Sequence, residues 1–188
     1  MSSIVDKMKS LRFGIEIETE ALGVPATAAA VARALAEVAG DAAPTGGQSR
    51  FDIPMHDGSG RCFKVVYDGS LGHGGAEIVS PILRYTDIET VQAIVREVRR
   101  SGARATHNCG IHIHVDGAEF DGKSLRNLVK YVSSKEDLIA HALNLSSRME
   151  WCRHSRPDFV SKISRIRNPS RERVLAAYYD CDEPTHRH

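Results

Sequence analysis

The chain has 188 residues, and 41% of them are hydrophobic, which is enough for an ordinary globular core. Twenty-five Lys and Arg residues against 24 Asp and Glu residues leave a net charge of +1, so no global field favours nucleic acid or an anionic membrane. No apolar run approaches the roughly 18 to 20 residues that span a bilayer. We therefore expect one cytoplasmic domain over residues 1–188, with neither nucleic acid nor membrane as a partner.

The first half of the chain alternates between strand and helix patterns. Alternating apolar and polar residues predict a strand over 11–18, and an alanine-rich stretch predicts a helix over 27–38. The segment 43–60 is rich in Gly, Pro, Asp and Ser, so it is predicted to be a loop with a short strand at its centre. Strands over 62–67 and 76–80, joined by turn residues, indicate a hairpin.

The second half is mainly helical. A capping box that begins at Thr86 predicts a helix that ends near residue 102, and a strand is predicted over 111–116. A long helical pattern over 125–145 is expected to break near Ser134, which could cap its second part, and Ser170 is expected to cap a last helix. Strands mixed with helices, including a hairpin, predict an α+β domain with helices over one face of an antiparallel sheet.

The polar positions of these strands carry an unusual set of side chains. They are Glu16 and Glu18 on the first strand, Asp68 and Glu77 on the hairpin, and His112, His114 and Asp116 on the later strand. Residues i and i+2 of a strand lie about 6.6 to 6.8 Å apart on one face, so two glutamates at this spacing could hold neighbouring cations. Clustered carboxylates raise one another's pKa unless a cation neutralises them. The apolar residues between them, such as Ile113, are expected to face the helices.

Two simpler interpretations of these residues remain open. An antiparallel sheet can leave one polar face in solvent, so each motif taken alone requires no ligand. The HxHxD pattern also occurs where a transition metal activates water, which would make the protein a metal-dependent hydrolase.

The side chains also indicate which cation such a site would prefer. Carboxylates with few nitrogen ligands and no thiolate favour Mg²⁺ or Mn²⁺ over structural zinc.

Three ordered motifs resemble one known family. The stretches "RFGIEIE" (12–18), "YDGSLGHGGAEIVSP" (67–81) and "CGIHIHVD" (109–116) are similar to those of the amidoligases, relatives of glutamine synthetase and glutamate–cysteine ligase. The resemblance implies a glutamine-synthetase-like fold, a curved antiparallel sheet whose concave face holds ATP and Mg²⁺ or Mn²⁺. It also implies ATP-dependent amide formation through an acyl phosphate, from an amine and the carboxylate of an amino acid, peptide or protein.

The resemblance also suggests roles for individual residues. The implied metal ligands are Glu16, Glu18, Glu77 and His112. The implied nucleotide-binding residues are His114, Ser70 and Asp116. The implied catalytic residues are Glu77, Asp68 and Arg148, the last as a contact to phosphate. The residues do not decide which carboxylate acts as a base and which as a metal ligand.

The family pattern continues past the helical region into a strand that resembles "GTxEFR", whereas this chain ends at "DEPTHRH". We therefore expect a sheet that lacks its C-terminal strands, and either an oligomer or a partner chain that completes it. The alternative to an active ligase is a fragment or pseudoenzyme that binds nucleotide without turnover.

Overall fold

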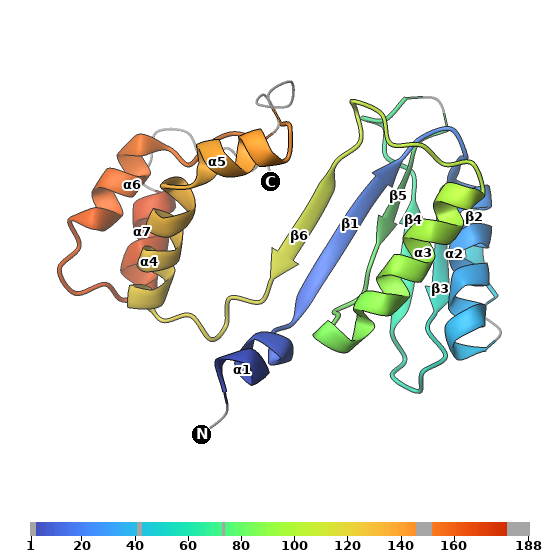
Figure 1. Ribbon diagram of the computed structural model, residues 1–188, viewed down its shortest axis with the longest axis horizontal. Helices are drawn as coiled ribbons and strands as arrows, with labels where there is room; N and C mark the ends of the chain where they lie inside the picture. The colour runs from blue at the N-terminus through green and yellow to red at the C-terminus, as the bar shows by residue number, and fades with distance from the viewer. Residues whose placement is uncertain (1–2, 41–42, 73, 146–151, 180–188) are drawn as a thin grey trace. The chain divides into compact units, whose positions relative to one another are not determined.

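The computed structural model describes residues 3–40, 43–72, 74–145 and 152–179, and the chain divides into two compact units, 1–116 and 117–188 (Figure 1). Each unit is considered by itself. Within the described residues no helix is both long enough and apolar enough to cross a membrane.

The first unit is built on a six-stranded sheet in the order β2-β3-β4-β5-β1-β6, and every neighbouring pair is antiparallel. Its strands are β1 (Phe13–Thr19), β2 (Thr45–Gly47), β3 (Arg50–Pro54), β4 (Cys62–Val66), β5 (Ala76–Val79) and β6 (Ile111–Val115). Its helices are α1 (Ile4–Ser10), α2 (Val24–Ala39), the 3-10 turn η1 (Tyr85–Asp87) and α3 (Ile88–Arg100). The predicted antiparallel sheet and the β4–β5 hairpin are confirmed, whereas β2 and α1 were not predicted.

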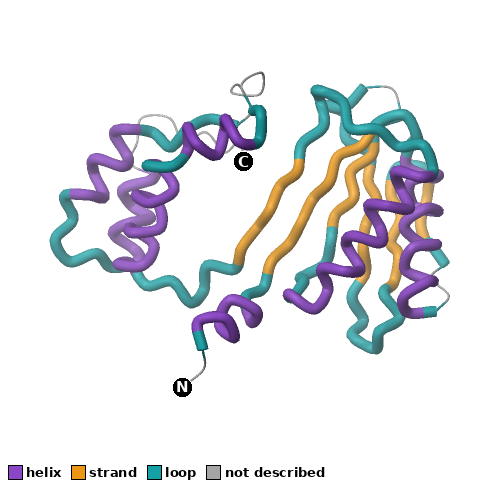
Figure 2. The backbone as a smooth tube through the Cα atoms, in the orientation of Figure 1, coloured by secondary structure: helices purple, strands orange, loops and turns teal. Residues whose placement is uncertain are grey.

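The core of this unit lies between the sheet and the two helices α2 and α3, which lie on the same side of it (Figures 1 and 2). Alanines on α2 bring its backbone close to the sheet, and the buried residues include Ala28, Leu35, Phe63, Val65 and Ile78. On β1 the apolar residues Phe13, Ile15 and Ile17 pack against this cluster. The alternate residues of β1 therefore point to the opposite face.

Within the first unit, α2 and α3 do not cover the edge strand β6. By register, Ile113 lies beside Ile15 on the helix side of the sheet, yet its side chain is 65% exposed. Ile111 and Val115 on the same face are exposed as well. The expectation that Ile113 packs under helices is therefore wrong, because α2 and α3 lie over the strands nearer the middle of the sheet.

The second unit is helical, with α4 (Gly122–Ser133), α5 (Glu136–Ala142), α6 (Pro157–Ser164) and α7 (Arg171–Tyr179). Its small core is formed by Phe159, Ile163 and Val174. Gly122 lies so close to the segment before α7 that an added Cβ would be 2.3 Å from the carbonyl oxygen of Pro169. The start of α4 therefore requires glycine for this close approach.

Two of the three predicted caps are wrong. Thr86 lies inside η1, and α3 begins after Asp87 without a side-chain cap. The predicted break after α4 is confirmed, but the Ser134 hydroxyl donates to the Tyr131 carbonyl oxygen and does not cap α5. Ser170 does cap α7, since its hydroxyl accepts a hydrogen bond from the Arg173 amide.

A guanidinium connects the loop after β3 to the start of α3. Arg61 forms a bidentate interaction with the Asp87 carboxylate, with nitrogen–oxygen distances of 2.8 and 3.1 Å. It also donates hydrogen bonds to Asp57 and to the Ile82 carbonyl oxygen. The Arg61 hydrogen bonds lower the pKa of Asp87. The pKa of Asp57 falls to about 2, chiefly because the Ser59 hydroxyl donates to it, and then because the Ser59 amide and Arg61 also donate to it.

We expect Arg61→Met to lower the free energy of unfolding by roughly 1–3 kcal/mol at neutral pH, since it leaves the mostly buried Asp87 without its charged donor. Lowered folded-state pKa values stabilise the protein above about pH 4, and that contribution is lost as the pH falls through them. The difference between the variant and the wild type should therefore shrink in acid, as urea unfolding at several pH values would measure.

Arg50→Met is the matched control, because Arg50 pairs with Asp52 at 3.2 Å where both side chains are well exposed. Its loss should change stability by less than about 1 kcal/mol. Equal losses in the two variants, or an Arg61→Met effect that does not depend on pH, would contradict the role given to Arg61.

Candidate functional site

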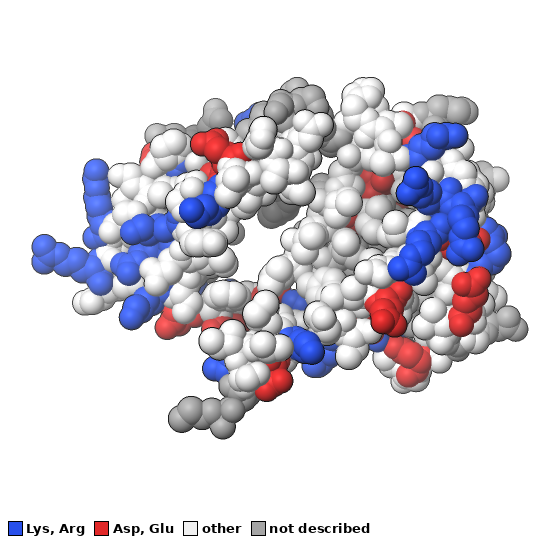
Figure 3. Space-filling view, in the orientation of Figure 1, with Lys and Arg blue, Asp and Glu red and all other residues white. Residues whose placement is uncertain are grey.

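The candidate site lies on the sheet face opposite to α2 and α3. Because Phe13, Ile15 and Ile17 of β1 pack towards the core, Glu16 and Glu18 lie on the other face. Charge differs between the two sides. Lys and Arg gather over α2 and α3 in the view of Figure 3, whereas the face opposite carries the acidic and histidine side chains of β1, β5 and β6.

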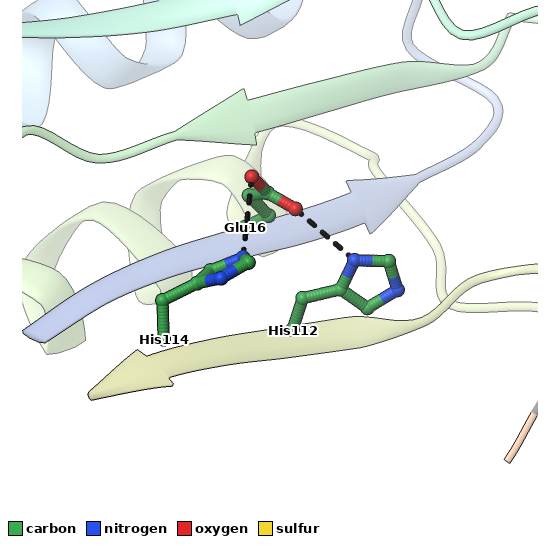
Figure 4. Close-up of side chains that lie close together, drawn as sticks. All are labelled: Glu16, His112 and His114. Carbon is green, nitrogen blue, oxygen red and sulfur yellow. Dashed lines mark hydrogen bonds and ion pairs between the residues drawn. The ribbon is translucent and has the colours of Figure 1, made fainter. Parts of the chain in front are cut away.

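Glu16 lies between two histidines. Its carboxylate oxygens are 3.0 Å from Nδ1 of His112 and 3.4 Å from Nε2 of His114 (Figure 4). One donor atom from each residue falls within 4.8 Å of the others. The register produces this cluster, because Glu16 lies directly opposite His112 on β6 and His114 is two residues further along the same face. These three side chains could hold one divalent cation.

Glu18 and Glu77 lie side by side on the same face. They are directly opposite each other on β1 and β5. Glu18 is two residues after Glu16 on β1. Burial raises the pKa of Glu77, and the nearby carboxylates of Glu16, Asp68 and Glu18 raise it further. The Glu18 carboxylate accepts a hydrogen bond from the Gly110 amide just before β6. The proposal that Glu18 and Glu77 bind metal stays a prediction, and their crowded negative charge favours a cation nearby.

Glu20, just after β1, accepts hydrogen bonds from two loops. The sequence patterns did not indicate this residue. Glu20 is only 9% exposed, and its carboxylate accepts hydrogen bonds from the Gly72 amide at 2.7 Å and from the Asn108 side chain at 3.4 Å. The Gly72 amide is the main reason that its pKa is lowered. In the first of these loops, Asp68 accepts from the Ser70 amide. Glu20 thus joins the loop of Asp68 and Ser70 to the segment that leads into β6.

Asp116 lies apart from the cluster of three. Its carboxylate forms an ion pair with Arg12, which precedes β1. The third member of the HxHxD pattern therefore has an arginine partner, and the three clustered donors are Glu16, His112 and His114. The HxHxD pattern therefore contributes two donors, and not three, to this cluster.

A groove of about 390 Å³ extends from the cluster along β1. Gly14 contributes to its floor, because a Cβ at this position would have only the His114 Cβ and the Ser80 hydroxyl, both 3.9 Å away, as neighbours. Its lining includes Arg12, Glu16, Val79, Pro81, His114 and Asp116. The groove is thus lined both by two residues of the candidate cation site and by the Arg12–Asp116 pair.

Lys64 is a second residue that sequence reasoning missed. It is exposed on β4, opposite Val79, which in turn lies opposite Glu16. The pairings therefore place Lys64 on the same face as the cluster, in a row that also includes His112. Only the strand order shows this, because the local pattern around Lys64 is that of any solvated strand. Arg148, the predicted phosphate contact, lies outside the described residues.

The donor set fits some cations better than others. One carboxylate oxygen and two imidazole nitrogens suit Mn²⁺ better than Mg²⁺, which prefers oxygen ligands in octahedral geometry. Glu18 and Glu77 would supply further oxygens one step away. The residues on this face therefore fit a divalent cation, with Mn²⁺ the better match at Glu16, His112 and His114.

A sequence model of the family described as "Putative amidoligase enzyme" matches residues 9–188. Neither the curated proteins nor the solved structures contain a significant match.

We expect His112→Ala to weaken Mn²⁺ binding by more than about tenfold, since even changes to groups behind metal ligands cost 10- to 100-fold in affinity. The fold should persist, because His112 faces away from the core. Titration of Mn²⁺ monitored by electron paramagnetic resonance measures the change. His141→Ala, at an exposed position on α5, is the control and should bind Mn²⁺ as the wild type does. Equal affinity in the two variants would remove His112 from the site.

We expect Glu20→Ala to loosen two loops at once, because it removes the acceptor for the Gly72 amide and for Asn108. Hydrogen exchange should become faster over residues 68–72 and 105–110, with little change in α2. Glu37→Ala, at an exposed glutamate on α2, is the control. Faster exchange in only one of the two loops would show that Glu20 does not join them.

Proposed function

Because the chain belongs to the amidoligase family, we propose that it is an ATP-dependent carboxylate–amine ligase. The observation that carries the proposal is the convergence of Glu16, His112 and His114 within 4.8 Å on an open sheet face. The crowded carboxylates beside them support it, since such a group of charges is stabilised by the cation that accompanies a nucleotide.

The groups on this face suit a substrate that carries phosphates. When bound, a divalent cation would neutralise phosphate oxygens and hold them in place. Glu16, His112 and His114 would hold this cation. Lys64, exposed in the same row, supplies a positive charge for the nucleotide, and Ser70 offers a hydroxyl in the loop held by Glu20.

The proposed reaction has two steps. A carboxylate oxygen of the substrate attacks the γ-phosphorus of ATP, and the bond to the bridging oxygen breaks to release ADP. The amine nitrogen then attacks the carbonyl carbon of the acyl phosphate, and phosphate leaves with the original carboxylate oxygen. In this scheme a carboxylate accepts the proton that the amine loses. Glu77 is our candidate, because it lies beside Glu18 on the ligand face and burial raises its pKa.

Mg·ATP or Mn·ATP should raise the melting temperature, because a ligand that binds only the native state stabilises it by mass action. Lys64→Met should reduce this shift without changing Mn²⁺ affinity, since Lys64 lies outside the cluster of three. Lys123→Met, on α4, is the control. A wild-type melting temperature that does not change at millimolar nucleotide would count against a nucleotide site.

Oxygen transfer tests the chemistry directly. With a substrate carboxylate labelled with ¹⁸O, the phosphate that is released together with the amide should carry one labelled oxygen, because the acyl phosphate is cleaved at its carbonyl carbon. Mass spectrometry of the phosphate measures this. Glu77→Gln should slow product formation by about 100-fold or more, the scale for loss of a general base. Amide formation with unlabelled phosphate would exclude the acyl phosphate route.

A further inference from the structure

The outer edge of β6 is open for pairing. Within the described residues, β1 is the strand that pairs with β6, and β6 ends the sheet. Hydrogen bonds from the Glu18 amide to Gly110 and from the Asp116 amide to Arg12 show that residues of even number face β1. The N–H and C=O groups of Ile111, Ile113 and Val115 therefore point away from β1, towards the outer edge.

The apolar side chains of the same three residues are exposed. Ile111 and Ile113 are each 65% exposed and Val115 is 55% exposed, on the helix side of the sheet. An uncovered strand edge that also presents β-branched apolar side chains is a template for another strand. Charged side chains usually protect such edges, and the outward-facing positions of β6 have none.

The sequence of β6, Ile-His-Ile-His-Val, is nearly the same in both directions. In an antiparallel pair of two copies with Ile113 on the two-fold axis, Ile113 would lie opposite the partner's Ile113, and Ile111 opposite the partner's Val115. Every outward N–H and C=O group of β6 would then have a partner, and apolar side chains would meet apolar side chains. If the register moved by two residues, outward N–H and C=O groups and apolar side chains at both ends of the paired strands would have no partner.

From this self-complementarity we infer that a second copy of the chain binds at β6, extending the sheet by antiparallel β6–β6 pairing. The two-fold axis is perpendicular to the sheet, so the ligand faces of both copies lie on the same side. His112 would then lie opposite the partner's His114. One short strand edge buries less than the roughly 1,200 Å² of a standard interface, so the dimer is weak and depends on concentration.

Sedimentation equilibrium of the full chain tests this from about 10 µM to about 1 mM, the range in which small interfaces associate. A chelator in every sample prevents association through cations shared between histidines. The wild type should shift from monomer to dimer across this range. A wild type that stays monomeric at the highest concentration would overturn the inference.

Ile113→Pro is the sharpest variant, because the N–H group that it removes points outward and the bonds to β1 stay intact. Ile113→Lys places like charges opposite each other on the two-fold axis and serves if the proline variant fails to fold. Each should weaken dimerisation by at least about tenfold, while circular dichroism shows unchanged secondary structure. Leu138→Lys, at a 64% exposed position on α5, is the control and should dimerise like the wild type. Dimerisation of Ile113→Lys at wild-type strength would overturn the inference.

Discussion

The antiparallel register between β1 and β6, which sets Glu16 opposite His112, is the constraint on which the candidate site depends. A slip by one residue would turn both histidines of β6 to the helix side and separate them from Glu16. In a covered strand, burial of the apolar face would prevent such a slip. On β6 that face is open, so other interactions must hold the register.

Two polar contacts at the ends of β6 provide this. The Glu18 carboxylate accepts the Gly110 amide just before the strand, and Arg12 forms an ion pair with Asp116 just after it. Both contacts join β1 to β6 in the observed register. Glu18 and Asp116 therefore have a structural role whether or not they also bind a ligand. This explains how motifs of alternating polar residues can specify both the position of a strand and the chemistry on its face.

The sequence allowed β1 and β6 to be predicted because each of them alternates, and alternation is a local property. It also showed correctly that Glu16 and Glu18 share a face, as do His112 and His114. It could not place Glu16 between the two histidines, or Lys64 in their row, because strand order and register depend on pairing between distant segments. The capping box predicted at Thr86 failed for a similar reason, since Thr86 has suitable neighbours in sequence but lies within a 3-10 turn.

The error at Ile113 shows a different limit. Alternation identifies which residues share a face, but not whether a helix covers that face at the edge of a sheet. The consequence is that β6 has three distinct surfaces, namely histidines on one face, exposed aliphatic side chains on the other, and backbone groups that point away from β1 along its outer edge.

Edge strands open at low free energy, so the geometry of His112 and His114 depends on how firmly β6 is held. A cation at the histidines and a strand at the edge would both stabilise the ordered strand. Two ligands that favour the same state must strengthen each other's binding. Pairing at the edge of β6 and cation binding on its face would therefore be thermodynamically coupled, through the same five residues.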